Sequence, residues 1–365
     1  MRGDPMNLLL IDTNPDWGGG QKWCLDTAAG LRARGASVTV ACLAGAPLGE
    51  RSRAAALAVI PAGGVLAGLR LARWARRERP EVVIATLGRD VRAGALVRLA
   101  CGARLVQRRG IARPVGRGFG SRSVDRFVAN SEAIAATLPS ERVELILNAV
   151  EPAPALDRAA ARARLGLAAD EELVLAVGRL APMKGQGLLL EAWREIEPHR
   201  PRARLWIAGG GVESGALERR RALLAHPERV RLLGFRDDTA ALYAAADLYV
   251  QPSIRDEGTS HALLEALAAG LPALVSDVAG LAETVRRCGG GRLHARGDFV
   301  ALARGLLELL ESPAELERLG RAGRTGVAAH HAPAVILEQW ERFLGQLARW
   351  RSSPPAATTS GEARR

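Results

Sequence analysis

Two lysines stand out in this chain because 49 of its 51 basic residues are arginines. Both lysines lie in glycine-rich segments, Lys22 in residues 17–22 and Lys184 in residues 178–185. Arg179 lies in the second segment, which directly follows an apolar run. A planar guanidinium and a flexible ammonium in one turn suit a compact anion such as a diphosphate. The turn therefore predicts an anion site at Arg179 and Lys184, whereas Lys22 could equally be an ordinary solvated charge.

A second segment, residues 257–270, carries two carboxylates around an expected helix start. Glu257 and Gly258 fall in the loop after an apolar strand, and Ser260 is a residue type that caps helix N-termini. A helix that begins here offers free backbone N–H groups and partial positive charge to a phosphate. Glu265 lies on the first turns of this helix, where its carboxylate can accept hydrogen bonds from both hydroxyls of a ribose. Glu257 is expected to face the group attached beyond the diphosphate.

Short apolar runs alternate with helical stretches along the whole chain, a pattern typical of parallel sheets covered by helices. Strands are expected at 8–12, 37–42, 82–86, 104–107, 126–129 and 143–147, and then at 173–177, 204–208, 230–233, 248–251 and 273–276. Prolines in residues 151–157 forbid a helix there and separate two doubly wound units. The predicted parts are a first domain 1–152, a second domain 153–333, an amphipathic helix 334–350 that must cover another surface, and a disordered tail 351–365.

Positive charge is concentrated in the first half of the chain. Residues 1–150 hold 22 basic and 12 acidic residues, whereas residues 151–365 hold 29 and 27. Nucleic acid, an anionic membrane surface and phosphorylated substrates are therefore candidate partners of the first half. Five arginines after an apolar stretch form either a membrane-facing patch or a solvated helix face: Arg70, Arg73, Arg76, Arg77 and Arg79.

Composition also excludes some classes of protein. No stretch reaches the roughly 18 apolar residues that a membrane-spanning helix needs. The four cysteines are scattered, without a CxxC pair or neighbouring histidines, which argues against a zinc site and for a reducing compartment. We therefore expect a cytoplasmic protein, with peripheral contact at the inner face of the cell membrane as a further possibility.

The order of these motifs resembles that of the retaining, nucleotide-sugar-dependent glycosyltransferases of the GT-B fold, in family 4, also called group 1. The shared order is a strand, a Gly-Arg turn ending in Lys-Gly, and two glutamates eight residues apart across a loop and a helix start. The resemblance covers nearly all of residues 6–350 and is strongest over 177–276. It implies an α/β protein of two Rossmann-like domains facing across a cleft, with the last helix crossing back to the first domain.

The resemblance also implies roles for individual residues. Arg179 and Lys184 would bind the donor diphosphate, Glu257 the transferred sugar and Glu265 the ribose. The glycine-rich first loop would close on the phosphate, and the base would rest on the turn at 234–236. The further donor-binding positions that follow are Gly18, Gly19, Gly20, Gly178, Phe235, Arg236, Gly258, Thr259 and Ser260.

The chain departs from the family pattern in the first domain. Many members place a histidine there, near the reacting carbon of the sugar, and this chain has no histidine before His199. Arg108 and Arg109 are the acceptor-side candidates in its place. His261 lies inside the second motif, and we expect it to pack or to position the loop, because its neighbours already supply polar contacts.

The expected reaction moves a hexosyl or heptosyl group from a UDP-, GDP- or ADP-linked donor to a hydroxyl of a glycan or lipid-linked acceptor, as in cell-surface polysaccharide or lipopolysaccharide synthesis. No DxD-type pair stands at a strand end to hold a metal, so no metal or cofactor is expected. The two cations and the helix N-terminus would stabilise the leaving diphosphate instead. No second carboxylate is placed to form a covalent intermediate, which favours same-face attack with retention of configuration.

Two alternative functions stay open from the sequence. A GT-B nucleotide-sugar 2-epimerase would release free nucleotide and epimerised sugar without any acceptor. A basic nucleic-acid-binding protein belongs to a different class; the aromatic content of only 4% and the absence of an RNA-binding motif argue against it.

Overall fold

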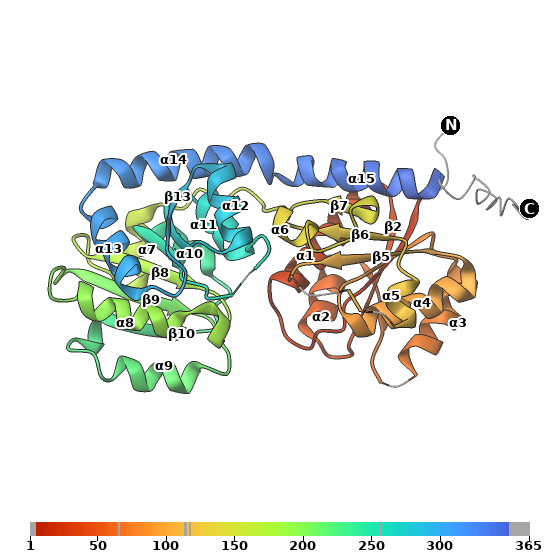
Figure 1. Cartoon of the computed structure of the whole chain (residues 1–365), viewed down its shortest axis with the longest axis horizontal. Helices are drawn as coiled ribbons and strands as arrows, with labels where there is room; N and C mark the ends of the chain where they lie inside the picture. Colours follow the sequence, from red (N-terminus) through yellow and green to blue (C-terminus); the bar gives the residue numbers. More distant parts are fainter. Residues whose placement is uncertain (1–4, 65, 113–114, 117, 256, 350–365) are drawn as a thin grey trace, which may run out of the picture.

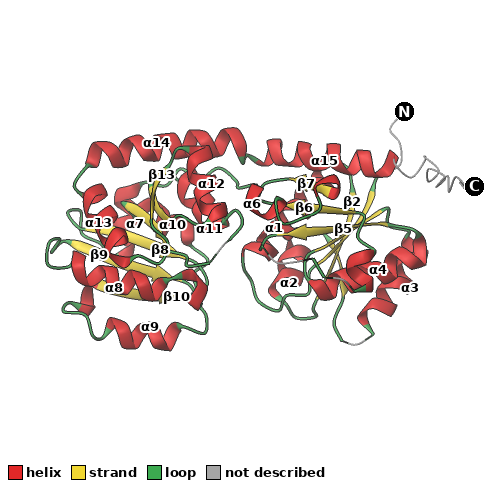
Figure 2. Ribbon diagram, in the orientation of Figure 1, coloured by secondary structure: helices red, strands yellow, loops and turns green. Residues whose placement is uncertain are grey.

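The computed structural model describes residues 5–64, 66–112, 115–116, 118–255 and 257–349 of the chain. It contains two parallel sheets, each covered by helices on both faces (Figures 1 and 2). This arrangement confirms the predicted fold class. The tail expected to be disordered, residues 351–365, lies outside the described residues.

The first domain is built on a seven-stranded sheet of order β3-β2-β1-β4-β5-β6-β7. Its strands are β1 (Asn7–Ile11), β2 (Ser37–Cys42), β3 (Ala58–Pro61), β4 (Val82–Ala85), β5 (Arg104–Arg109), β6 (Arg126–Ala129) and β7 (Val143–Leu145). Strand β3 was not predicted, because this short edge strand is mostly half-exposed and ends in proline. The strand order reverses beside β1, which creates the crevice where ligands of doubly wound folds bind.

Helices cover both faces of this sheet. They are α1 (Gly19–Ala33), α2 (Pro47–Ala54), α3 (Ala67–Glu78), α4 (Gly88–Cys101), α5 (Phe119–Arg122) and α6 (Glu132–Ala135). Successive β1 residues enter two separate cores: Leu8 and Leu10 pack on one face, and Leu9 and Ile11 on the other. All four are fully buried, so the strand reads as a continuous apolar run.

The second domain has a six-stranded sheet of order β10-β9-β8-β11-β12-β13. Its strands are β8 (Glu172–Val177), β9 (Ala203–Ala208), β10 (Val230–Gly234), β11 (Leu248–Gln251), β12 (Ala273–Ser276) and β13 (Gly291–His294). Its helices are α7 (Arg158–Leu165), α8 (Gln186–Ile196), α9 (Ser214–Arg221), α10 (Thr239–Ala245), α11 (His261–Ala268), α12 (Ala279–Cys288), α13 (Phe299–Leu310) and α14 (Pro313–His330). The edge strand β13 was also not predicted, since its four residues begin with glycine and include one arginine and one histidine.

The last helix, α15 (Pro333–Arg349), lies on the first domain although it follows α14 of the second (Figure 1). Trp340 of α15 is fully buried, with its ring centroid 5.8 Å from that of Trp23 in α1. Arg34 and Glu341 form an ion pair of 2.6 Å beside this contact. The apolar face predicted for this helix therefore packs on the first domain, as the predicted fold requires. None of the helices in the described ranges is long and apolar enough to cross a membrane.

Candidate functional site

Glycines bring three turns together at the carboxyl edge of the second sheet. The amide of Gly209 donates to Gly234 O at 2.7 Å, and a Cβ atom at Gly209 would lie 1.9 Å from Gly178 O. Gly209 also has a φ of 148°, which side chains rarely allow, so this close approach requires glycine. Arg179, directly after the first of these turns, and Phe235, after the last, are both exposed at this edge.

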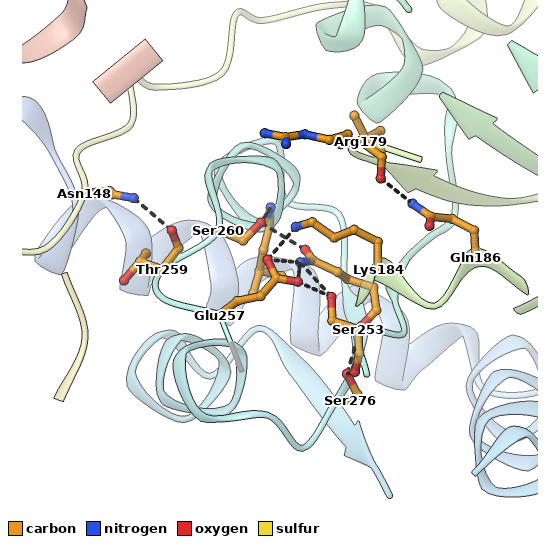
Figure 3. Close-up of polar contacts among 12 residues, drawn as sticks. Asn148, Arg179, Lys184, Gln186, Ser253, Glu257, Thr259, Ser260 and Ser276 are labelled. Carbon is orange, nitrogen blue, oxygen red and sulfur yellow. Dashed lines mark hydrogen bonds and ion pairs between the residues drawn. The ribbon is translucent and has the colours of Figure 1, made fainter. Parts of the chain in front are cut away.

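Lys184 and Glu257, predicted from separate motifs, form an ion pair. Lys184 Nζ lies 2.5 Å from Glu257 Oε2, and their side chains are 23% and 11% exposed. Ser253 Oγ donates to the other carboxylate oxygen, and Gln251 Nε2 lies 3.5 Å from the same atom. Figure 3 shows Lys184, Glu257 and Ser253 pointing toward one another, with Arg179 extending past the same region. The carboxylate is thus held by one cation and two neutral polar groups.

The loop before α8 is pressed against the loop after β11, which makes this ion pair possible. Gly185 has a φ of 71°, and a Cβ atom there would lie 1.9 Å from Pro252 O. The amide of Ile254 donates to Met183 O at 2.9 Å. Lys184 therefore emerges from backbone that is fixed on both sides.

Helix α11 begins where its sequence predicts. Ser260 Oγ accepts a hydrogen bond from the amide of Leu263 at 3.4 Å, which confirms the predicted N-cap. Glu265 lies one turn after His261, so both side chains share one face of the helix. Tyr243 Oη donates to Glu265 Oε2 at 3.1 Å. Burial raises the pKa of Glu265, and the nearby charge of Lys22 opposes that rise.

Lys22 was left open between a binding residue and a surface charge. It pairs with Asp26 at 3.1 Å in the next turn of α1. It also lines, with Glu265 and Tyr243, a cavity of about 1190 Å³ that extends along the join at residues 151–158. The structure therefore places Lys22 beside Glu265, the carboxylate predicted to bind the ribose. The sequence around Lys22 did not reveal this proximity.

The glycine-rich loop of the first domain lies directly against the second domain. A Cβ atom at Gly18 would lie 3.7 Å from Arg179 Nη2, and one at Gly19 would lie 3.2 Å from His261 Cδ2. At Gly20 such an atom would meet nothing within 4 Å. The structure thus brings the loop expected to contact phosphate beside Arg179 and the start of α11.

Arg108, one of the two acceptor-side arginines, reaches this region. Arg108 is 7% exposed, its Nη2 donates to Asn148 Oδ1 at 2.8 Å, and its guanidinium carbon lies 4.5 Å from the ring centroid of Trp23. Burial lowers the pKa of Arg108 to about 10, and the charge of Asp12 opposes this effect. Neighbouring residues of a strand point to opposite faces, so Arg109 projects from the other face of the sheet.

The predicted donor loop is held by the first domain. The hydroxyl of Thr259 donates to Asn130 O, and its carbonyl accepts from Asn148 Nδ2 at 2.8 Å. A Cβ atom at Gly258 would lie 2.2 Å from Asn130 Oδ1. Neither asparagine was predicted. Both come shortly after β6 and β7, and polar residues at the carboxyl ends of parallel strands were the signal that could have identified them.

The turn predicted to hold the base is engaged within its own domain and with the first. Arg236 pairs with Asp238 at 2.6 Å, inside its own loop. Asp237 between them pairs with Arg51 of α2 at 2.7 Å. Phe235 is 57% exposed. The structure therefore leaves Phe235 open at the sheet edge and directs Arg236 to Asp238. Across the described residues, no three His, Cys, Asp or Glu side chains gather as a metal site would require.

Comparison with known proteins shows which protein family this chain is similar to. Residues 157–326 match the model of the glycosyl transferases group 1. A D-inositol 3-phosphate glycosyltransferase of Thermobispora bispora is 34% identical over 260 residues, which are 65% of this chain and 59% of that protein. The lipopolysaccharide core biosynthesis glycosyltransferase LpsE of Rhizobium meliloti is 27% identical over 282 residues, 77% of this chain and 80% of that protein. The chain spans 52% to 63% of the length of five D-inositol 3-phosphate glycosyltransferases that it matches.

Solved structures share the fold. HepE of Anabaena, crystallised with UDP and glucose, superposes with a TM-score of 0.83 at 21% identity, over 93% of this chain and all of that one. At this identity the similarity establishes the two-domain GT-B architecture.

Proposed function

We propose that this chain, whose residues 157–326 match the model of the glycosyl transferases group 1, transfers a sugar from a nucleoside diphosphate to an acceptor hydroxyl. One observation carries the proposal. The Lys184–Glu257 pair lies beside Arg179 and the N-terminus of α11, and the Gly18–Gly20 loop of the other domain lies against the same place. Two cations and the N-terminus of a helix thus lie close together, and the glycine-rich loop of the first domain faces them.

The departing diphosphate is the centre of the proposed mechanism. As the glycosidic bond breaks, negative charge grows on the leaving phosphate oxygens. Arg179, Lys184 and the free amides at the start of α11 are already oriented to stabilise that charge, so they need no reorganisation during the reaction. In this proposal they do the work that other transferases assign to a metal ion, and no cofactor takes part.

In this proposal the two glutamates bind the transferred sugar and the ribose. Glu257, held by Ser253 and Lys184, accepts hydrogen bonds from hydroxyls of the sugar. Glu265 accepts from the ribose, with Tyr243 fixing its orientation. Glu257 is occupied by these partners rather than left as a free nucleophile. Same-face attack with retention of configuration, as in family 4, therefore fits better than a two-step displacement.

The relatives narrow the choice of donor and acceptor. HepE was solved with UDP and with UDP-glucose, which favours a UDP-sugar among the UDP, GDP and ADP donors. Relatives named for D-inositol 3-phosphate and for the lipopolysaccharide core favour an anionic or lipid-linked glycan acceptor. The excess of basic residues over 1–150 would attract such an acceptor.

A membrane surface is the partner that helix α3 favours. Arg70, Arg73, Arg76, Arg77 and Arg79 are all exposed, and none of them makes an ion pair or side-chain hydrogen bond with a described residue. Leu66 and Leu69, on the same face, are 55% and 60% exposed. Unpaired arginines interleaved with exposed leucines match an anionic lipid surface. We place the enzyme in the cytoplasm, at the inner face of the cell membrane.

The test is nucleotide binding without added metal. A panel of UDP, GDP and ADP and their sugars is titrated by calorimetry in EDTA, and transfer to lipid-linked acceptors is then assayed. One nucleotide should bind, and Glu265→Ala should weaken it about 10- to 100-fold because the ribose loses hydrogen bonds to a charged group. The proposal fails if no nucleotide binds, or if Glu265→Ala and Lys184→Ala both keep wild-type binding and transfer.

A further inference from the structure

His261 is a buried histidine whose polar atoms have no partner. Its side chain is 7% exposed, and neither Nδ1 nor Nε2 makes a hydrogen bond. Buried polar groups are nearly always hydrogen-bonded, and an apolar side chain of similar size would avoid the loss of hydration. Packing, one of the two roles expected from its sequence context beside positioning of the loop, therefore does not by itself explain why an imidazole occupies this position.

The ring lies where elements of both domains meet. It is on the first residue of α11, and its Cδ2 edge faces Gly19, the first residue of α1. Two helix N-termini, each with free backbone amides, therefore meet at this imidazole. Beside Gly19, the position of Gly20 faces space with no atom within 4 Å of a Cβ there.

The charges around the ring are positive. Burial, with smaller contributions from Arg108 of β5, Lys22 of α1 and His331 after α14, lowers the pKa of His261 to about 3. The imidazole is therefore neutral at physiological pH and can donate one N–H. A neutral donor surrounded by cations and helix N-termini suits an anion, because the donor adds a hydrogen bond without adding repulsion to its cationic neighbours.

We propose that His261 is a donor-binding residue, whose ring N–H donates a hydrogen bond to a diphosphate oxygen held between the Gly18–Gly20 loop and the start of α11. This inference rests on the proposed function. It adds a residue of the second domain that would bind the anion while the anion also contacts the glycine loop of the first domain. Because the ring is sandwiched between α1 and α11, its hydrogen bond forms only when the anion lies against the glycine loop. His261 thereby favours donor binding in the closed arrangement of the domains.

His294 supplies a matched control. It is also a buried histidine of the second domain, 5% exposed, with an unpaired Nε2. Burial likewise lowers its pKa. Its Nδ1 lies 2.9 Å from Ala295 O, and it ends the edge strand β13 rather than facing the first domain. Effects common to any buried histidine should therefore appear at both positions.

The first experiment measures binding of inorganic pyrophosphate and of UDP to wild-type protein and to His261→Leu, His261→Asn and His261→Gln. Leucine fills the space without a donor and should weaken both ligands about 10- to 100-fold. The asparagine amide can lie near the Nδ1 position and the glutamine amide near Nε2. One of the two should therefore restore affinity and identify the donating nitrogen. His294→Asn should keep wild-type affinity.

The second experiment follows the wild-type protein and needs one folded variant only to assign the resonances. Ring ¹⁵N chemical shifts of the six histidines are followed at pH 7 as pyrophosphate is added to the wild-type protein, with His261 assigned from whichever of the three variants folds. A ring nitrogen of His261 should shift on saturation, and those of His294 should not.

Separate outcomes overturn the two proposals. Wild-type affinity in His261→Leu, or unmoved His261 resonances at saturating pyrophosphate, removes the role of His261 and leaves the proposed function standing. Failure of every nucleotide and of pyrophosphate to bind the wild-type protein removes the proposed function, and this inference with it.

Discussion

At the scale of single residues, the pair of Lys184 and Glu257 shows how the site is prepared. The two residues are 73 positions apart and come from different loops, yet their charges lie 2.5 Å apart. The carboxylate keeps the ammonium in place before any ligand binds, so little side-chain entropy remains to be lost on binding. An arriving diphosphate can take over the same ammonium while Glu257 keeps its hydrogen bonds from Ser253 and Gln251.

Lys184→Ala is expected to lower kcat/KM for sugar transfer by about 100- to 1,000-fold, the usual effect of removing one preorganised donor to a developing negative charge. Steady-state transfer with the best donor of the panel measures this. The unfolding temperature should change little, because the lysine side chain is partly exposed. Arg194→Ala, which removes an exposed cation of α8, is the control and should keep wild-type activity. An unaltered rate in Lys184→Ala would contradict the assignment.

The buried His331 should make the folding stability of the protein sensitive to acid. It is 1% exposed, and burial lowers its pKa to about 4, so the folded protein keeps it neutral while the unfolded chain takes up a proton below about 6.5. Stability is therefore complete above that pH and falls as pH drops from about 6.5 toward 4, by about 2 kcal/mol at pH 5 for this residue. Urea unfolding at pH 7 and pH 5 measures the difference.

Replacing His331 by glutamine should shrink the pH 7 to pH 5 difference in unfolding free energy by about 2 kcal/mol. The neighbouring variant His330→Gln is the control, since His330 is exposed and should leave the difference as in the wild type. Equal pH dependence in the wild type and His331→Gln would show that this histidine does not carry the effect.

At the scale of elements, helix α3 differs from the other arginine-rich helices. Arginines of α9, α13 and α14 pair with glutamates of the same or neighbouring helices, whereas the four arginines of α3 and Arg79 directly after it have no such partners among the described residues. Surface pairs add little stability, so their presence elsewhere serves mainly to balance charge. On α3 that balance is missing, which leaves an unneutralised cationic face.

The triple variant Arg73→Ala, Arg76→Ala and Arg77→Ala should weaken binding to vesicles containing anionic phospholipid by about 100-fold, since each arginine near such a surface contributes about 1 kcal/mol. Vesicle sedimentation measures the partition. The matched variant Arg219→Ala, Arg220→Ala and Arg221→Ala of α9 should bind as the wild type does. If the wild type does not sediment with anionic vesicles, α3 is a solvated face.

At the scale of the whole molecule, the site depends on contact between the domains. Glu283 of α12 accepts hydrogen bonds from the amides of Glu132 and Ala133 at 2.7 and 2.8 Å, so it caps α6 of the first domain. These hydrogen bonds and the Thr259 contacts form a seam between the two domains. The seam aligns the donor loop with the glycine loop. Closure of such a cleft also excludes water, which would otherwise hydrolyse the donor.

Gly258→Ala should hinder that closure, because the new methyl group would lie 2.2 Å from Asn130 Oδ1. The expected result is a loss of about 100-fold in kcat/KM, the size of effect that an ångström of misplacement can have. Small-angle X-ray scattering with bound nucleotide should give a larger radius of gyration than the wild type. Gly215→Ala on α9, whose Cβ would meet only an arginine end at 3.6 Å, is the control. A variant that closes and turns over normally would show that the seam tolerates separation.

The sequence alone determined the fold class, most of the strands and the cap of α11. Buried parallel strands such as β1 are continuous apolar runs, and a capping serine acts on the amide three residues away, so local pattern suffices for both. Strands β3 and β13 escaped prediction because short edge strands bury too little to show a pattern. Arg179, Lys184, Glu257 and Glu265 were identified as chemical groups, and their proposed roles stay predictions.

Only the tertiary structure decided what these groups meet. Asn130, Asn148, Lys22 and the orphaned ring of His261 become part of the site through contacts between domains, and no local pattern encodes such a distance. The contact of Arg108 with Trp23 likewise came from the tertiary structure. The physical reason is that the sequence gives the type of each side chain directly. Its partners, in contrast, depend on how strands far apart in the chain end at a common edge of the sheet.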